Sequence, residues 1–236
     1  MQGAALAGKK VLLTHSADGL GFVIAIAFAQ AGAEVVIHDR SAAVVAAAVE
    51  HLSLAAPGSR VKGKDTDLST DAGVRQMLAY AGPIDTLVID AHAVGVVNFS
   101  RLEELEAHQD RKALRDQAES LSNDFVGSMK GDNPKSIFVL SLTPTAAEES
   151  SGPSASLSTC SVGAGAGFTV YTVSVRDLIL APVADIVKSE VLRTNATLAD
   201  VIKYLLRDHR PAAIAMGLTA IHKVTERIIK SCTIQH

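Results

Sequence analysis

Two closely spaced glycines, Gly19 and Gly21, follow a short apolar run near the start of the chain. They belong to the segment Thr14-His15-Ser16-Ala17-Asp18-Gly19-Leu20-Gly21, which joins an expected strand to an expected helix. A glycine turn at this place presents the free amides of a helix N-terminus, which bind phosphate groups. Asp39 closes the next expected strand, 18 residues after Gly21, where a carboxylate accepts hydrogen bonds from an adenosine ribose. The spacing therefore indicates a dinucleotide site. A tight turn followed by a solvated strand end, with no nucleotide, remains the alternative.

A second chemical pattern is absent from the sequence. In a helix, a lysine four residues after a tyrosine lies one turn away, where the two side chains could act together in proton transfer. The chain has three tyrosines, and the residues four places after them are not lysines: Ile84 follows Tyr80, Val175 follows Tyr171, and Asp208 follows Tyr204.

The elements that must position the glycine turn and Asp39 form an alternating pattern along the chain, in which short β-branched runs are followed by longer helical patterns. This alternation predicts a parallel sheet covered by helices on both faces. We expect strands over 10–14, 33–38, 60–64, 85–90, 136–141, 168–175 and 212–221, and helices over 21–31, 42–52, 71–81, 101–129 and 197–206, with Ser41 capping the second helix. The prediction is one α/β domain over residues 1–236, with a doubly wound parallel sheet of about seven strands.

The turn resembles the Thr-Gly-x-x-x-Gly-Ile-Gly motif of the short-chain dehydrogenase/reductase (SDR) family. Asp67-Leu68 is similar to the family's Asp-Val after the third strand, and residues 198–206 and 213–218 resemble its last helix and its glycine-bearing last strand. The resemblance implies a Rossmann-like fold that holds NAD or NADP. The cofactor-binding residues that it implies here are Ser16, Gly19, Leu20, Gly21, Asp39, Asp67, Leu68 and Ala91.

Several residues depart from the family pattern. His15 replaces the first glycine of the turn, and Asp90-Ala91-His92-Ala93 stands where the family has Asn-Asn-Ala-Gly. Ser141 falls one place before the family's catalytic serine, which reverses its expected facing on a strand. Residues 151–158 contain neither the expected tyrosine nor the lysine, and residues 154–167 are too short and glycine-rich for the family's helix. We therefore assign no catalytic residue and expect Tyr171 to be a core residue.

These departures favour a catalytically degenerate SDR-fold protein, a structural or regulatory subunit of a larger assembly that retains NAD(P)(H) as a structural ligand. The alternative is a divergent NAD(P)-dependent oxidoreductase, or a cyclase or lyase, with Ser141, Cys160 or His92 as the proton donor. A nucleotide-sensing module is a third reading. Asp39 suggests NAD(H), while Arg40 beside it is compatible with a 2′-phosphate.

Composition narrows the range of partners and compartments. A net charge of −3 and a pI near 6.2 do not produce the positive electrostatic potential that attracts nucleic acid. No apolar run is long enough to suggest a membrane span. Two cysteines without paired spacing suit a reducing compartment, and no targeting segment is visible, so we expect the cytoplasm or the mitochondrial matrix. Because the second of the family's two interface helices is missing, we expect protein partners or an altered oligomer. The histidines show no metal-binding spacing.

Overall fold

The computed structural model describes residues 5–90, 124–125, 135–141, 155–160, 168–175, 180–207 and 212–233. The strands are β1 (Lys10–Thr14), β2 (Glu34–Asp39), β3 (Val61–Asp65), β4 (Thr86–Asp90), β5 (Lys135–Ser141), β6 (Ala155–Cys160) and β7 (Phe168–Val175). The helices are α1 (Gly19–Gln30), α2 (Ala42–Ala55), α3 (Asp71–Ala81), α5 (Leu180–Thr194), α6 (Leu198–Arg207) and α7 (Ala212–Thr233). None of the helices in these ranges combines the length and the apolarity that crossing a membrane requires.

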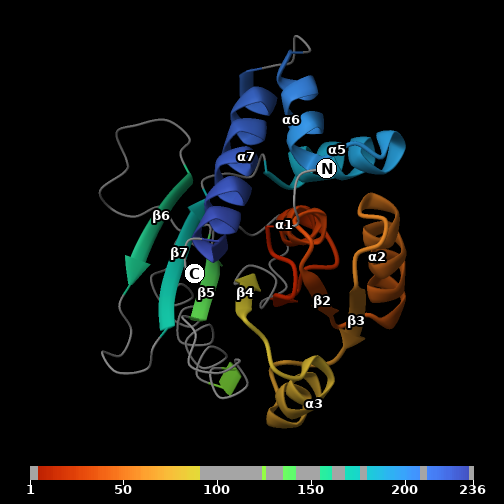
Figure 1. The fold of residues 1–236 in the computed structure, drawn as a ribbon, viewed down its shortest axis with the longest axis vertical. Coiled ribbons are helices and arrows are strands. Elements are labelled where there is room, and N and C mark those ends of the chain that lie inside the picture. Colours follow the sequence, from red (N-terminus) through yellow and green to blue (C-terminus); the bar gives the residue numbers. More distant parts are fainter. Residues whose placement is uncertain are drawn as a thin grey trace, which may run out of the picture.

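The strands form one sheet in the order β3-β2-β1-β4-β5-β7-β6 (Figure 1). Neighbouring strands are parallel from β3 to β7, and β6 pairs antiparallel with β7 at the edge of the sheet. The reversal of strand order next to β1 is the doubly wound arrangement, which places the carboxyl ends of the parallel strands along one edge. The predicted fold class is thus confirmed, except that one strand is antiparallel.

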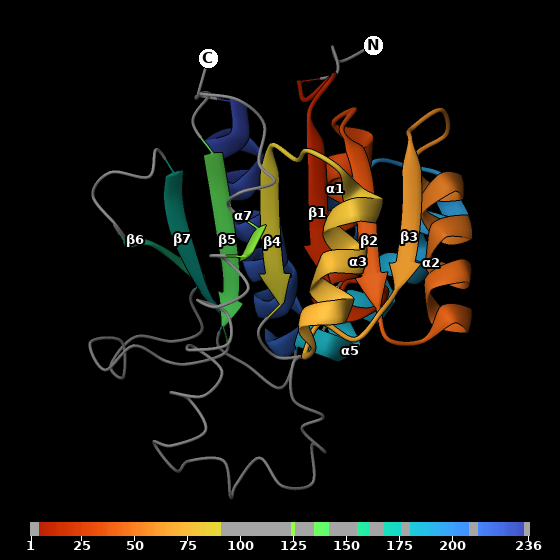
Figure 2. The ribbon, with the colours of Figure 1, turned by 90° about the horizontal axis from the view of Figure 1, so that it is seen from below.

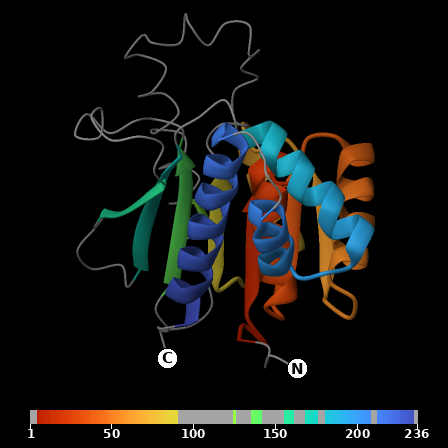
Figure 3. The ribbon, with the colours of Figure 1, turned by 90° about the horizontal axis from the view of Figure 1, so that it is seen from above.

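Alternate residues of the central strands enter two separate cores. Val11 and Leu13 pack with residues of α1, α5, α6 and α7, whereas Leu12 packs with Val74 and Met77 of α3. Figures 2 and 3 show α3 on one face of the sheet and α1, α5 and α7 on the other. Both faces of the strands are therefore buried, which explains their continuous runs of apolar residues.

The last predicted strand is wrong, because residues 212–221 are the first half of helix α7. The short repeat of apolar residues around Ile214 suggested a strand, but the buried residues continue at helical spacing to the end of the element. They include Leu218, Ile221, Thr225, Ile228 and Cys232. Gly217 has a different role from a strand glycine, since a Cβ there would lie 2.9 Å from a Val183 methyl group of α5. It allows α7 to pack closely against α5.

Two elements between β5 and α6 were not among the predicted strands and helices. They are helix α5 over residues 180–194 and, within residues 143–167, strand β6. Its edge position explains the weak pattern, because an edge strand needs less apolar surface than a central one. The expected long helix over residues 101–129 lies almost entirely outside the described residues.

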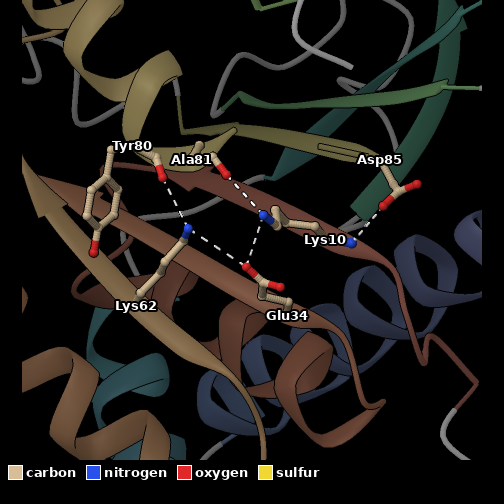
Figure 4. Close-up of polar contacts among 6 residues, drawn as sticks. All are labelled: Lys10, Glu34, Lys62, Tyr80, Ala81 and Asp85. Carbon is tan, nitrogen blue, oxygen red and sulfur yellow. Dashed lines mark hydrogen bonds and ion pairs between the residues drawn. The ribbon is translucent and has the colours of Figure 1, made fainter. Parts of the chain in front are cut away.

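A cluster of charged side chains ties the amino ends of the strands to the end of α3 (Figure 4). Lys10 donates from Nζ to the Ala81 carbonyl at 3.1 Å and forms a 3.1 Å ion pair with Glu34. Lys62 donates to the Tyr80 carbonyl at 3.1 Å and lies 3.8 Å from the same Glu34 carboxylate. Two lysines thus satisfy carbonyls at the C-terminus of α3, where the helix dipole also favours positive charge. Lys10, Glu34 and Lys62 stand on three different strands, so no local sequence pattern indicates this cluster.

We expect Lys10→Met to reduce the free energy of unfolding by about 1–2 kcal/mol, because it removes a partly buried hydrogen bond and an ion pair. Urea denaturation measures the change. Lys64→Met is the matched control, since Lys64 pairs only with the neighbouring exposed Asp65 among the contacts described, and its effect should stay within about 0.5 kcal/mol. Equal effects of the two substitutions would show that the cluster does not stabilise the sheet.

Candidate nucleotide-binding site

The turn between β1 and α1 has an unusual backbone at both ends. His15 has a φ of 47° and Gly19 a φ of 58°. This left-handed region suits glycine and costs a residue with a side chain about 1 kcal/mol. The backbone at position 15 therefore has the conformation that the missing glycine would adopt without strain, although a histidine stands there.

Ser16 fixes the turn to the sheet. Its hydroxyl donates to the Leu13 carbonyl at 2.9 Å, and its N–H donates to the His38 carbonyl at 2.9 Å. The side chain is buried. Of the predicted cofactor-binding residues, Ser16 thus has the clearest structural role, which is to join the glycine turn to the end of β2.

Helix α1 begins at this turn, and its first amides lie outside the helical hydrogen-bond ladder. The first helical hydrogen bond runs from the Phe22 N–H to the Asp18 carbonyl at 3.2 Å, so the amides of Gly19, Leu20 and Gly21 precede the helical ladder. A Cβ on Gly21 would lie 3.0 Å from both Cα and Cβ of Ser16. Glycine at this position lets the turn lie directly on the helix. The geometry suits a phosphate group at the helix N-terminus.

Lys188 of α5 reaches the same helix N-terminus. Its Nζ lies 2.9 Å from the Asp18 carboxylate and 4.7 Å from the centre of the Phe22 ring. Burial alone would raise the pKa of Asp18, but the hydrogen bond from Lys188 and the Gly19 amide outweigh it, so the pKa lies below its usual value. The sequence analysis missed Lys188 as a site residue, because 170 residues separate it from Asp18.

Two carboxylates lie at the same edge of the sheet. Asp39 ends β2, and its carboxylate accepts a hydrogen bond from the Ser41 N–H at 3.2 Å. Asp67 follows β3, and its carboxylate accepts from the N–H and the hydroxyl of Ser69 at 3.0 and 2.7 Å. Those bonds lower the pKa of Asp67. Leu68 is buried in the core under α3, so its side chain contributes mainly to packing.

Two histidines pack together beneath the turn. The rings of His15 and His38 meet edge to face, with their centres 4.9 Å apart. The His15 N–H donates to Nδ1 of His38 at 3.2 Å, and Nε2 of His38 lies 2.9 Å from the Thr66 carbonyl. Since Nδ1 accepts and a carbonyl can only accept, His38 is neutral with its proton on Nε2. Both rings are buried.

Nδ1 of His15 is buried without a hydrogen-bond partner in the part of the chain that the structure describes. An unsatisfied buried polar atom costs about 1–3 kcal/mol. Burial, and after it the neighbouring His38, lowers the pKa of His15 to about 4. Burial also lowers the pKa of His38. Sequence reasoning identified His15 as a departure but gave no sign that it would pair with His38.

Two of the three candidate proton donors, Ser141 and Cys160, lie apart in the sheet. Ser141 ends β5 at the carboxyl edge, the same edge as the glycine turn. Cys160 pairs with Val170, which pairs with Ile137, so it lies four residues away from Ser141 along the sheet. That separation is about 13 Å. His92, like the predicted cofactor residue Ala91, lies outside the described residues.

Tyr171 lies within the sheet, paired with Phe138 of β5 and Thr159 of β6. A strand over residues 155–160 occupies part of the region where the resemblance implies a long helix. Within the described ranges, no group of three or more His, Cys, Asp or Glu side chains is placed to hold a metal ion.

Comparison with known proteins agrees with this geometry. Residues 9–113 match the family model described as short chain dehydrogenase. This segment, which is less than half of the chain, is therefore similar to the short-chain dehydrogenase/reductase family that the sequence resembles.

Two relatives illustrate the similarity. The chain is 37% identical over 92 residues to 5-keto-D-gluconate 5-reductase of Escherichia coli, covering 36% of this chain and 35% of the relative. It is 40% identical over 87 residues to (2S)-[(R)-hydroxy(phenyl)methyl]succinyl-CoA dehydrogenase subunit BbsD of Thauera aromatica, covering 35% and 34%. The chain thus covers about a third of the length of these relatives.

Among solved structures, the chain is similar to an NADP complex of RhlG from Pseudomonas aeruginosa. The identity is 26% and the TM-score 0.43, covering 60% of this chain and 56% of the other. A hydroxysteroid dehydrogenase from Escherichia coli matches with 25% identity and a TM-score of 0.44, covering 58% and 56%.

Proposed function

We propose that this protein binds a nicotinamide dinucleotide but is catalytically degenerate, and that it acts as a structural or regulatory subunit of a larger assembly. The observation that carries the proposal is the contrast between two parts of the chain. The glycine turn, the first amides of α1 and the Asp39 carboxylate are all present at one edge of the sheet. No tyrosine in the chain has a lysine four residues later.

The residues present fit a dinucleotide in chemical type. The α1 amides suit its pyrophosphate, Gly21 allows close approach of the backbone, and Asp39 can accept hydrogen bonds from the adenosine ribose. Asp39 favours NAD(H), because a carboxylate repels a 2′-phosphate. Two further observations support the role as a subunit. One relative is itself named as a dehydrogenase subunit, and the outer side of α6 exposes Tyr204 and Leu206, which a partner protein would cover.

Calorimetric titration with NADH and NADPH, a carbonyl-reduction assay and the native mass of the protein from its own cells test the proposal together. The expected result is NADH binding without turnover, in a complex larger than a homodimer. Turnover of a carbonyl or alcohol substrate at ordinary enzyme rates would refute the degenerate function. Absence of NADH binding would refute the nucleotide site.

We expect Asp39→Ala to weaken NADH binding about tenfold, because the ribose loses a charge-assisted hydrogen bond. Binding of NADPH should not weaken, since the repulsion of the 2′-phosphate is removed. Asp65→Ala is the control, as Asp65 ends the neighbouring strand β3 and carries the same charge. If both variants bind NADH like the unchanged protein, Asp39 does not contact the ribose.

The second candidate is a divergent NAD(P)-dependent oxidoreductase, or a cyclase or lyase, with a different proton donor. Two observations favour it: the relatives are named as reductases and dehydrogenases, and Ser141 ends its strand at the same edge as the glycine turn. If turnover is found, Ser141→Ala should reduce kcat about 10²–10⁴-fold. Unchanged turnover would exclude Ser141 as the donor.

A further inference from the structure

The imidazole of His15 lies beside the position that the dinucleotide's ribose should take. The ring packs on His38, the residue that precedes Asp39 at the end of β2. Four neighbouring groups act electrostatically on the ring: His38, Asp39, Arg40 and Asp67. These groups come from the ends of β2 and β3, the same edge as the turn that carries His15 itself. A ribose held by Asp39 against the glycine turn would have to share this space with the ring.

The ring is held there by packing rather than by polar bonds. Only 8% of the residue surface is exposed, yet Nδ1 has no hydrogen-bond partner among the described residues. The ring's described contact is the edge-to-face one with His38. The backbone of His15 is also in the left-handed region, at a φ of 47°. A side chain with an unsatisfied nitrogen on a strained backbone is less firmly fixed than an apolar core residue.

We propose that the His15 imidazole occupies the adenosine half of the nucleotide site and must rotate away before a dinucleotide can bind. Position 15 therefore determines the affinity of the site for dinucleotides. This inference rests on the proposed nucleotide-binding function. The family's glycine would leave the space open, whereas here the protein's own ring fills it. Only molecules in which the ring is displaced can bind the dinucleotide. The apparent affinity of the unchanged protein is therefore the intrinsic affinity multiplied by the fraction of such molecules.

The rotation has a direct consequence for the His15–His38 contact. The N–H of His15 can keep its hydrogen bond to Nδ1 of His38, because that bond belongs to the backbone. The ring contact, by contrast, has to break when the side chain leaves. Binding of a dinucleotide should therefore move the imidazole proton resonances of His15, and move those of His51, in the second half of α2, much less.

The decisive experiment is calorimetric titration of NADH into the unchanged protein, His15→Gly and His15→Asn, with His51→Ala as the matched control. We expect His15→Gly to bind NADH at least tenfold more tightly than the unchanged protein. His15→Asn should bind with intermediate affinity, because asparagine tolerates the left-handed backbone and is smaller than histidine. His51→Ala should bind like the unchanged protein. Circular dichroism confirms that each variant is folded.

The outcomes separate this inference from the proposed function. Equal or weaker NADH binding by folded His15→Gly, while the unchanged protein binds, overturns the inference and leaves the nucleotide site in place. No binding by any folded variant overturns the nucleotide site itself, and the inference with it. Unchanged His15 resonances in the NADH complex would also contradict displacement of the ring.

Discussion

Replacing Gly73 by alanine should reduce the free energy of unfolding by about 2–3 kcal/mol, although alanine is the better helix former. Gly73 lies in the first turn of α3, where the helix meets the turn after β3. A Cβ at this position would collide with the carbonyl oxygen of Asp67, and would lie 2.6 Å from the Asp67 carbonyl carbon and 2.9 Å from the Thr66 hydroxyl. Two of these three atoms belong to the backbone, so no side-chain rotation relieves the collision.

The backbone around Gly73 also has little freedom to shift. Its N–H donates the capping hydrogen bond to the Thr70 hydroxyl at 3.0 Å, and its carbonyl accepts from the Thr66 hydroxyl at 3.1 Å. Moving the turn would weaken both bonds and displace Asp67, a predicted cofactor residue. Urea denaturation gives the stability. Ala72→Ser, on the exposed side of the same helical turn, should change it by less than about 0.5 kcal/mol. A Gly73→Ala protein as stable as the unchanged one would contradict this packing.

The second large effect is a loss of stability on mild acidification. The pKa of His15 is lowered from 6.5 to about 4, first by burial and then by His38. Above pH 6.5 both the folded and the unfolded chain have a neutral His15. Between pH 6.5 and 4 the unfolded chain binds a proton that the folded chain does not, so stability is lost as the pH falls through this window. His15 alone should lower the free energy of unfolding by about 2 kcal/mol between pH 7 and 5.

His38 adds to the loss in the same direction, since burial lowers its pKa as well. Carboxyl groups with lowered pKa values, such as Asp18 and Asp67, have an ordinary value of 3.8 and therefore protonate below the window. Urea denaturation at pH 7, 6 and 5 measures the effect. His15→Asn should show a smaller acid-induced loss than the unchanged protein. If the two proteins lose equal stability, the His15 ring is not buried in solution.

The first ninety residues could be read from the sequence almost element by element. Helix α3 has its predicted limits, Asp71–Ala81, and Ser41 caps α2 by accepting from the Val44 N–H. These elements are bounded by local signals, namely a capping side chain, a glycine, or a run of buried β-branched residues. The glycine turn was located for the same reason, because its residues are contiguous.

The elements of the C-terminal half were harder to predict from the sequence, because the patterns that define them extend over more residues or depend on tertiary contacts. The helical spacing of Leu218, Ile221, Thr225 and Ile228 becomes visible only when a window extends beyond the expected strand. The resemblance to a family strand favoured the shorter reading. Strand β6 is positioned by its pairing with β7, and its own residues give no indication of this tertiary contact.

At the candidate site, the contacts between residues far apart in the sequence were not predicted. His15 and His38 meet because β1 and β2 are neighbours in the sheet, and Lys188 reaches Asp18 because α5 packs on α1. Sequence spacing identifies groups that act along one turn, but it does not show which side chains meet across two elements. The absence of a functional Tyr–Lys pair remains a prediction from the sequence.

The charged cluster around Lys10 and Glu34 sits at the opposite end of the strands from the glycine turn. Four residues separate Lys10 from Thr14 along β1, which corresponds to about 13 Å. The interactions that hold the strands in register are therefore physically remote from those that would receive a ligand. Such separation lets the ligand-facing rim accumulate substitutions without loss of the fold. The histidine at position 15, where the family motif has a glycine, therefore changes this rim without touching the charged cluster.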